Sequence, residues 1–451
     1  MLMAEIFDRF VEKTPVGVMT RALLERALVA QELDELFAEH AEQQYERKLL
    51  FSTMVDLMAL VVCGVHPSVN AAYKAIRERI PSSLTAVYDK LGGVEMSTTE
   101  ALVAHSAQKL RPVVSALGAI EPWLPGHRIR LLDGNHLAAT ERRLEVLRAS
   151  AAGPLPGQSL VVLEPESGLV VQMVGCEDGY AQERSLLDPI LSGACPKDVY
   201  LADRNFCTLG LMFGLEQRGA SFIIRQHANL PIESLGRLRR RGKTETGTVL
   251  EQPVRLRLGE STLTLRRIVL RLSTPTRDGD TEMAILTDLP PSISAETVAR
   301  SYRKRWDIET LFARVERDLN SEISALGYPK AALFGFGVAL VAANIFAVVR
   351  AALEAAKRSD ETAADMPLSE YAIAHAARSS YEGIDAMLDD DFWEQFRTMP
   401  PRAFAKKLVA WAKWADWPRF RKSVRGPKKP VPKRTRFKNR PHVSTARLLA
   451  E

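Results

Sequence analysis

The sequence predicts an α/β fold in which a sheet-forming segment lies between two helical segments. Apolar residues recur at helical spacing through residues 1 to about 120, and short apolar runs typical of strands begin at His127. Helical spacing then returns at Ser294. At 451 residues, with 46% hydrophobic and 26% charged residues, the chain is long enough for several domains of ordinary globular composition.

The N-terminal segment, residues 1–120, is predicted to be a helical domain, with DNA binding suggested only by one pair of its helices. Its expected helices lie at 18–30, 32–40, 49–62, 68–79 and 97–114. Residues 68–79 and 84–91, joined across Pro81, have the spacing of a helix-turn-helix. A plain structural bundle is the alternative for this pair.

Residues 121–227 are predicted to form the first part of the core. Strands are expected at 128–132, 159–163, 169–174, 199–202 and 221–225, with helices at 181–191 and 208–217. Three strands, a helix, a strand, a helix and a strand is the order of the ribonuclease H fold. In that fold the first and fourth strands are neighbours. Asp133 and Asp203, which follow these two strands, should therefore lie close together.

A β-rich insertion is predicted at residues 228–293. Alternating strands at 248–256, 263–272 and 282–286 are separated by turn residues. The insertion explains why 106 residues separate Asp203 from Glu309 while only 70 separate Asp133 from Asp203. Its entrance carries Arg239, Arg240 and Arg241, which suit contact with a DNA backbone; a solvated loop is the alternative.

The core is expected to resume at residues 294–357 with a helix capped by Ser294. Tyr302, Arg305 and Glu309 are separated by three and four residues, which would place them along one helix face. An arginine and a glutamate at this spacing often form only a surface ion pair. With Asp133 and Asp203, however, Glu309 completes three carboxylates that suit two divalent metal ions.

Nineteen uncharged residues, 331–349, are nominally long enough to cross a bilayer. Asn344 and several small residues favour a helix buried inside the protein instead, so no membrane partner is expected. Further helices are expected to form a C-terminal lobe at residues 358–415.

The last segment, residues 416–451, is predicted to be a basic tail. Residues 419–440 contain eleven Lys or Arg and no acidic residue, which leaves 6 − 11 = −5 for the rest of the chain. Prolines and few apolar residues indicate an extended arm that contacts phosphates, with a solvated tail as the alternative. The basic residues include Lys428, Lys429, Lys433 and Arg434.

Four cysteines without a C-x-x-C pair argue against a structural zinc site and fit a reducing cytoplasm. The N-terminus lacks the charged and apolar regions of a signal peptide.

The carboxylate motif resembles that of DDE transposases of the insertion sequence 4 family. The family motif is Tyr, two residues, Arg, three residues, Glu, six residues, Lys. Tyr302, Arg305 and Glu309 match it, whereas Glu316 stands in place of the lysine. The family's two aspartates match Asp133 and Asp203, and residues 441–449 resemble a tail common in such proteins.

The resemblance implies a bacterial transposase that cleaves the ends of an insertion element and joins them to target DNA. Two Mg²⁺ ions, replaceable by Mn²⁺, would be held by Asp133, Asp203 and Glu309. Tyr302 and Arg305 would hold a phosphate, and Arg317 would take over the missing lysine's contact. Trp306 would stack on a displaced base or, alternatively, pack in the core.

The implied partner is double-stranded DNA, bound by a dimer in the cytoplasm at the nucleoid. Two other functions remain open at this point. One is a catalytically impaired DNA-binding remnant, which the substitution at Glu316 favours. The other is a nuclease of the same fold without strand transfer.

Overall fold

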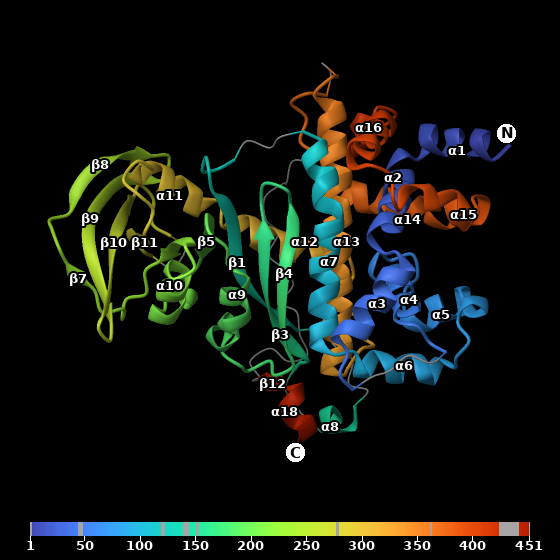
Figure 1. Ribbon diagram of the computed structural model, residues 1–451, viewed down its shortest axis with the longest axis horizontal. Coiled ribbons are helices and arrows are strands. Elements are labelled where there is room, and N and C mark those ends of the chain that lie inside the picture. The colour runs from blue at the N-terminus through green and yellow to red at the C-terminus, as the bar shows by residue number, and fades with distance from the viewer. Residues whose placement is uncertain are drawn as a thin grey trace.

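The computed structural model describes residues 2–43, 48–118, 122–138, 144–149, 153–276, 279–360, 363–423 and 442–450. A large mixed sheet occupies one side of the molecule, and helices from both ends of the chain gather on the other (Figure 1). The protein therefore has a mixed α/β fold, as the sequence predicts.

The N-terminal residues are helical, as expected. The helices are α1 (Leu2–Lys13), α2 (Pro15–Ala27), α3 (Ala30–His40), α4 (Phe51–Val62), α5 (Val69–Ala75), α6 (Leu84–Gly93) and α7 (Met96–Ala116). The helix expected at 68–79 ends at Ala75 and is followed by a 3₁₀ turn, η1 (Arg77–Arg79). Ser68 and Ser83 cap α5 and α6 by accepting hydrogen bonds from backbone N–H groups.

The large sheet has ten strands in the order β4-β3-β1-β5-β6-β11-β10-β9-β7, with β8 also paired to β9. Its first half contains β1 (Arg128–Leu137), β3 (Gly157–Glu164), β4 (Leu169–Cys176), β5 (Asp198–Ala202) and β6 (Ser221–Arg225). Strand β1 pairs with β3 in the antiparallel sense and with β5 in the parallel sense. The predicted adjacency of the first and fourth core strands is confirmed.

Strand β1 is longer than predicted. Asp133 and Gly134 were expected to end it, but pairing with β3 continues from Asp133 opposite Val161 to Leu137 opposite Gly157. The Asp-Gly pair forms no turn because the antiparallel neighbour satisfies the backbone hydrogen bonds on this side. Pairing with β5, by contrast, stops at Leu131. Asp133 is thus within β1 but just beyond the stretch that β5 covers.

The β-rich stretch continues the same sheet. It contains β7 (Glu233–Ser234), β8 (Arg239–Thr244), β9 (Gly247–Leu258), β10 (Ser261–Leu272) and β11 (Glu282–Thr287). Strand β11 pairs antiparallel with β6, which joins these strands to the core. A turn at Gly259, whose φ of 58° suits glycine, connects β9 to β10.

Helices cover both faces of the core half of the sheet. The α7 face carries the first apolar cluster, which includes Ile129 and Leu131 of β1 and extends through the N-terminal helices. The opposite face carries a second cluster, which includes Leu132 and packs against α9 (Leu187–Gly193) and α10 (Leu209–Glu216). Residues of β1 alternate between the two clusters, as the pleat of a strand requires.

Helix α13 (Pro329–Lys357) lies beside α7 and against β4 (Figure 1). It is the one helix among the described residues that is long and apolar enough to cross a membrane, and 94% of its apolar window is buried inside the protein. Asn344 in its middle donates hydrogen bonds to the Ser106 hydroxyl at 2.8 Å and the Val170 carbonyl at 3.0 Å. Its side-chain oxygen accepts a hydrogen bond from the Val170 N–H. The prediction that residues 331–349 form a buried helix is confirmed.

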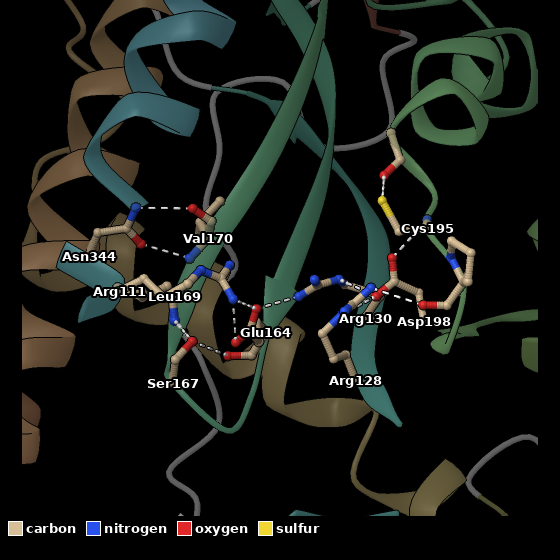
Figure 2. A network of polar contacts seen from close by, with 12 residues as sticks. Arg111, Arg128, Arg130, Glu164, Ser167, Leu169, Val170, Cys195, Asp198 and Asn344 are labelled. Atoms are coloured by element: carbon tan, nitrogen blue, oxygen red, sulfur yellow. Dashed lines mark hydrogen bonds and ion pairs between the residues drawn. The ribbon is translucent and has the colours of Figure 1, made fainter. Parts of the chain in front are cut away.

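A polar network ties the strands together near the start of β1 (Figure 2). Arg130 of β1 contacts Glu164 of β3 and Asp198 of β5, and Arg111 of α7 also binds Glu164, at 2.7 Å. Arg128 donates to Asp198 at 2.8 Å. Burial alone would raise the pKa of Glu164, but Arg130 and Arg111 outweigh burial and lower that pKa below its ordinary value. The network fixes how β1, β3 and β5 align.

The C-terminal helices pack on the N-terminal ones. They are α14 (Glu370–Met387), α15 (Asp390–Trp393), α16 (Pro401–Ala412) and α17 (Trp417–Phe420). A final short strand and helix, β12 (Val443–Ser444) and α18 (Thr445–Ala450), return to the core, where β12 pairs with β2 (Pro154–Leu155). Arg447 of α18 donates to Asp178 at 2.7 Å, so the last described residues are anchored beside the core sheet.

Candidate active site

Two aspartates come together at one end of the parallel pair of strands. The register matches Arg128 with Asp198 and Leu131 with Leu201, and Asp133 and Asp203 each lie two residues beyond this last pair. Asp203 directly follows β5 and begins the short helix η3 (Arg204–Phe206). Its Oδ1 accepts a hydrogen bond from the Asn205 N–H at 2.6 Å. The strand order therefore brings Asp133 and Asp203 to one edge, as the sequence predicts.

The predicted single helix that carries the third carboxylate is two helices. Helix α11 (Ala295–Arg303) begins at Ser294, which caps it as expected, and α12 (Trp306–Asp318) follows. Between them, the N–H groups of Lys304 and Arg305 bond to carbonyls three residues earlier rather than four. This tighter 3₁₀ geometry interrupts the α-helix. Tyr302 and Glu309 consequently lie on different helices, and the prediction of one continuous helix is wrong.

Arg305 joins two of the predicted carboxylates. Its Nη1 donates to Asp133 Oδ2 at 2.9 Å, and its Nη2 donates to Glu309 Oε1 at 2.6 Å. The guanidinium is buried, and its Nε has no hydrogen-bond partner among the described residues. Helix α12 thus contacts β1 through a cation between two anions, and Glu309 reaches the site of the aspartates.

The three carboxylates share one electrostatic environment. Burial raises the pKa of Asp133 to about 6, and the negative charges of Asp203 and Glu309 also raise it. The Arg305 guanidinium and the Gly134 N–H oppose this increase without cancelling it. The raised pKa therefore reflects mainly the burial of Asp133, which the Arg305 guanidinium offsets in part.

Tyr302 is buried beside this group at the end of α11. Burial raises the pKa of its phenol to about 12, so the hydroxyl keeps its proton at neutral pH. The charges of Arg305 and Asp203 both act on this hydroxyl, and burial outweighs them. The tyrosine, the arginine and the carboxylates are brought together as the motif predicts.

Trp306 lies on the surface at the first position of α12, with 62% of its area exposed. The core alternative for this residue is therefore wrong. The Arg305 guanidinium lies 5.7 Å from the centre of its ring. An exposed aromatic ring beside the carboxylates remains available to another molecule.

Arg317 is engaged at the other end of α12. Its Nε and Nη2 donate to the two carboxylate oxygens of Asp318 at 2.7 and 2.6 Å, while half of its side chain stays exposed. The Asp318 side chain is almost completely buried. Glu316, which replaces the lysine of the motif, is exposed.

The three arginines predicted to contact DNA form part of a strand rather than a loop. Arg239, Arg240 and Arg241 are exposed at the start of β8, and Arg241 donates to Glu251 at 2.6 Å. The predicted tail residues Lys428, Lys429, Lys433 and Arg434 lie outside the described residues.

Sequence reasoning missed one acidic residue at this edge. Glu183 begins the short helix η2 (Glu183–Leu186), and its Oε1 would lie 2.0 Å from a Cβ atom added to Gly134. Burial raises the pKa of Glu183, and the charge of Asp203 contributes. A glycine directly after the first aspartate was the available signal, since close approach of a side chain is one reason for a strand glycine.

The donor chemistry of the site suits a hard divalent ion. Asp133, Asp203 and Glu309 offer carboxylate oxygens, which Mg²⁺ prefers. No group of three or more such ligands among the described residues is already assembled around a common point. Arg305 occupies the space between Asp133 and Glu309 and provides there the positive charge that these anions require. The residues therefore fit a divalent ion in their donor chemistry.

A family match covers the stretch that contains these residues. Residues 126–345 match the family described as Transposase DDE domain, and this stretch includes β1, β5 and α12. A search of curated proteins found no match. Among solved structures, a cryo-EM structure of a piggyBac transposase synaptic complex with hairpin DNA aligns over 90% of this chain and 86% of that chain. Its identity of 10% and TM-score of 0.38 are too low to support conclusions about this chain.

Proposed function

We propose that this chain, which contains a transposase DDE domain at residues 126–345, cleaves the ends of an insertion element and joins them to target DNA. The observation that supports this most strongly is the bridge from Asp133 through Arg305 to Glu309. Its hydrogen bonds join Asp133 to Glu309, which are far apart in the sequence. Asp203 lies at the same edge of the sheet. A surface ion pair between Arg305 and Glu309 would not require a buried guanidinium.

We propose a ribonuclease H-like core as the scaffold of this site. The strand order β4-β3-β1-β5-β6, with β1 antiparallel to β3 and parallel to β5, supports it. The β-rich stretch 228–293 interrupts the core and extends the sheet through β11. We also place the chain in the insertion sequence 4 family, on the spacing of Tyr302, Arg305 and Glu309.

DDE transposases use divalent metal ions, and we propose two Mg²⁺ ions here, replaceable by Mn²⁺. Asp133 would bind both, and Asp203 and Glu309 would each complete one site. When bound, the ions would supply positive charge to the attacking and leaving oxygens of phosphodiester transfer. Arg305 would leave Asp133 and Glu309 and, together with Tyr302, hold a phosphate beside the cut.

The proposed DNA contacts extend beyond the carboxylates. Trp306 would stack on a displaced base, and the exposed β8 arginines Arg239, Arg240 and Arg241 would bind phosphates. The basic tail would add contacts that do not depend on sequence. We propose that a dimer binds two element ends and that the protein works in the bacterial cytoplasm at the nucleoid.

The test is metal-dependent cleavage of linear DNA that carries the inverted repeats flanking the gene. Asp133→Asn, Asp203→Asn and Glu309→Gln each remove one charge without a change in size. Each should abolish cleavage, while gel-shift affinity for the same DNA in a metal-free buffer stays close to wild type. Asp188→Asn, on the exposed surface of α9, is the matched control and should cleave normally.

The outcome separates the proposal from its alternatives. Cleavage by a variant at wild-type rate removes that residue from the site. Binding without cleavage by the wild-type protein identifies an impaired DNA-binding remnant. Cleavage without joined products identifies a nuclease.

A further inference from the structure

The C-terminal ends of α12 and α4 meet at one arginine. Asp318 is the last residue of α12, and Cys63 follows the last residue of α4. Arg378, in the middle of α14, donates from its Nε to the Cys63 carbonyl at 2.8 Å and from its Nη2 to the Asp318 carbonyl at 3.1 Å. A residue of the C-terminal lobe therefore joins an N-terminal helix to the helix that carries Glu309.

The chemistry of the two helix ends explains why an arginine lies between them. The last carbonyls of a helix have no partner within it, and they carry partial negative charge. Two such ends repel one another unless a cation lies between them. The Arg378 guanidinium supplies that charge, and its planar fork of N–H groups can donate in two directions at once. A lysine would keep the charge without the fork, and a glutamine would keep a donor without the charge.

The contact at the end of α4 is close-packed. Gly64 has a φ of 70°, which favours glycine, and a Cβ atom added there would lie 2.6 Å from Arg378 Cζ. The guanidinium thus lies directly against the backbone. A second link joins the same two helix ends, because the Asn320 side chain donates to the Val61 carbonyl at 3.3 Å. The ends of α4 and α12 are therefore held together by more than one contact.

Helix α12 is thus held at both ends. At its start, Arg305 donates to Asp133 of β1. At its end, Arg378 holds the Asp318 carbonyl. Glu309 lies nine positions before Asp318, roughly 14 Å along the helix, so a tilt at the far end displaces the Glu309 carboxylate. In the proposed function Arg305 leaves Asp133 to hold a phosphate, and the contacts at the end of α12 would then contribute more to the position of this helix.

We infer that Arg378 is a positioning residue for catalysis. By holding the ends of α4 and α12 together, it fixes the axis of α12 and hence the place of Glu309 relative to β1. It acts through this helix and not on the reacting atoms. Because α4 belongs to the N-terminal helical segment, Arg378 also connects that segment to the candidate active site. The inference rests on the proposed function, which gives Glu309 its role.

The test compares Arg378→Gln with a matched control, Arg26→Gln. Arg26 of α2 is buried and also donates to two main-chain carbonyls, those of Met399 at 2.7 Å and Phe396 at 3.4 Å. It therefore links an N-terminal helix to the C-terminal lobe by the same chemistry but without α12. Thermal unfolding shows which variants are folded and how much stability each one loses.

Single-turnover cleavage at saturating DNA measures the chemical step. The rate of Arg378→Gln should fall roughly 10- to 100-fold, because a displacement of about 1 Å at a reacting group lowers rates on this scale. Gel-shift affinity for the same DNA in a metal-free buffer should stay close to wild type. Arg378→Lys should recover part of the rate, since it keeps the cation, and Arg26→Gln should cleave normally.

Amide hydrogen exchange of the protein without DNA gives a readout that does not depend on activity. Exchange in residues 306–318 is compared with exchange in β1 of the same variant, which corrects for a general loss of stability. This relative exchange should become faster in Arg378→Gln and stay as in the wild type in Arg26→Gln.

A wild-type cleavage rate in folded Arg378→Gln overturns the inference and leaves the proposed function intact, and so does an equal loss of rate in Arg26→Gln. If the wild-type protein cleaves no DNA, the proposed function fails. Hydrogen exchange then decides whether Arg378 positions α12, and unchanged relative exchange in residues 306–318 overturns the inference as well. If Arg378→Gln does not fold, Arg378→Lys takes its place, and a wild-type rate with wild-type exchange in that variant overturns the inference.

Discussion

Arg305 neutralises two carboxylates that are far apart in the chain, and its position explains how a site of clustered anions folds without a metal. A buried guanidinium with hydrogen bonds to Asp133 and Glu309 offsets part of their repulsion. Asp133 still has its pKa raised to about 6. The folded protein thus retains an electrostatic cost at this edge, which a divalent ion would reduce.

Trp306 gives a prediction about a single exposed ring. Trp306→Ala should lower the yield of cleaved DNA by about tenfold or more, because a stacked base is worth roughly 1–3 kcal/mol. The melting temperature should not change, since 62% of the side chain is exposed. Trp414→Ala is the matched control, because Trp414 is 56% exposed and lies just after α16. Equal loss in both variants would show that surface tryptophans have only a general effect.

The substitution at Glu316 gives a second prediction. Arg317→Ala should reduce excised and joined products much more than Glu316→Ala, and Glu316→Lys should be tolerated or more active. The structure adds a second consequence, because Arg317 is bound through two hydrogen bonds to the buried Asp318. Arg317→Ala should therefore lower the free energy of unfolding by about 1–3 kcal/mol, because Asp318 loses both hydrogen bonds.

Product yield and thermal unfolding must therefore be measured together for these variants. A double variant, Arg317→Ala with Asp318→Asn, separates the two effects, because it removes the unpaired buried charge. If the double variant regains stability but not activity, Arg317 contacts DNA. An inactive Glu316→Ala beside a normal Arg317→Ala would instead give Glu316 a role of its own.

Among the elements, β1, β3 and β5 owe their alignment to Glu164 and its arginines, which gives a prediction about pH. The pKa of Glu164 is below its ordinary value of 4.5, so the fold stabilises the ionised form. That stabilisation is complete above pH 4.5 and is lost as the pH falls through the lower, folded pKa. Glu164→Gln should lower the free energy of unfolding by about 3–5 kcal/mol at neutral pH. Below pH 4.5 the free energies of unfolding of the variant and the wild type should become more similar.

Chemical unfolding at neutral and acidic pH measures this difference. Glu166→Gln is the control, because burial raises the pKa of Glu166 rather than lowering it. Glu166→Gln should therefore change the free energy of unfolding little at neutral pH. A Glu164→Gln effect that is independent of pH would show that the arginines do not act through charge.

Most elements of the core could be predicted from sequence because their signals are local. The strands at β3 to β6 have apolar runs bounded by turns, and α13 has a long uncharged stretch. The continuation of β1 through Asp133-Gly134 could not be predicted, because its cause is a partner strand. The interruption before α12 could not be predicted either, because Arg305 there contacts Asp133, which is distant in sequence.

In the site, too, residues with a local sequence signal could be predicted, and a residue that depends on a distant contact could not. Asp133, Asp203 and Glu309 were found because motif spacing and strand order bring them together. Glu183 was missed because Gly134 signals only that some side chain comes close, and the residue that does so is distant in sequence.

At the scale of the whole molecule, the sheet is continuous from β4 to β7, and the basic surface of β8 lies at its far end from β4. A DNA molecule bound at the carboxylates and at β8 would run along this sheet. The C-terminal residues return to the core at β2, so the basic segment before them is joined to structured residues on both sides.

The basic segment gives the last prediction. Replacing Lys428, Lys429, Lys433 and Arg434 with glutamine should weaken specific and random DNA binding to the same extent. The slope of log affinity against log salt should fall by about 3–4, since each phosphate contact on duplex DNA contributes about 0.9. Gel-shift titrations at several salt concentrations measure the slope. The control is the double variant Lys406→Gln with Lys407→Gln, which removes two exposed charges from α16. The change in slope is divided by the number of charges removed, so that the two variants can be compared. An unchanged slope would show that the segment does not touch DNA.

Helix α13 also has a consequence for the order in which the protein is made. Its central Asn344 bonds to Ser106 and Val170, which leave the ribosome 238 and 174 residues earlier. The surface that receives this long apolar helix is therefore synthesised before the helix itself. A chain interrupted before residue 329 would present an open apolar groove along α7 and β4 to chaperones and proteases. Completion of this apolar core thus depends on the synthesis of residues 329–357.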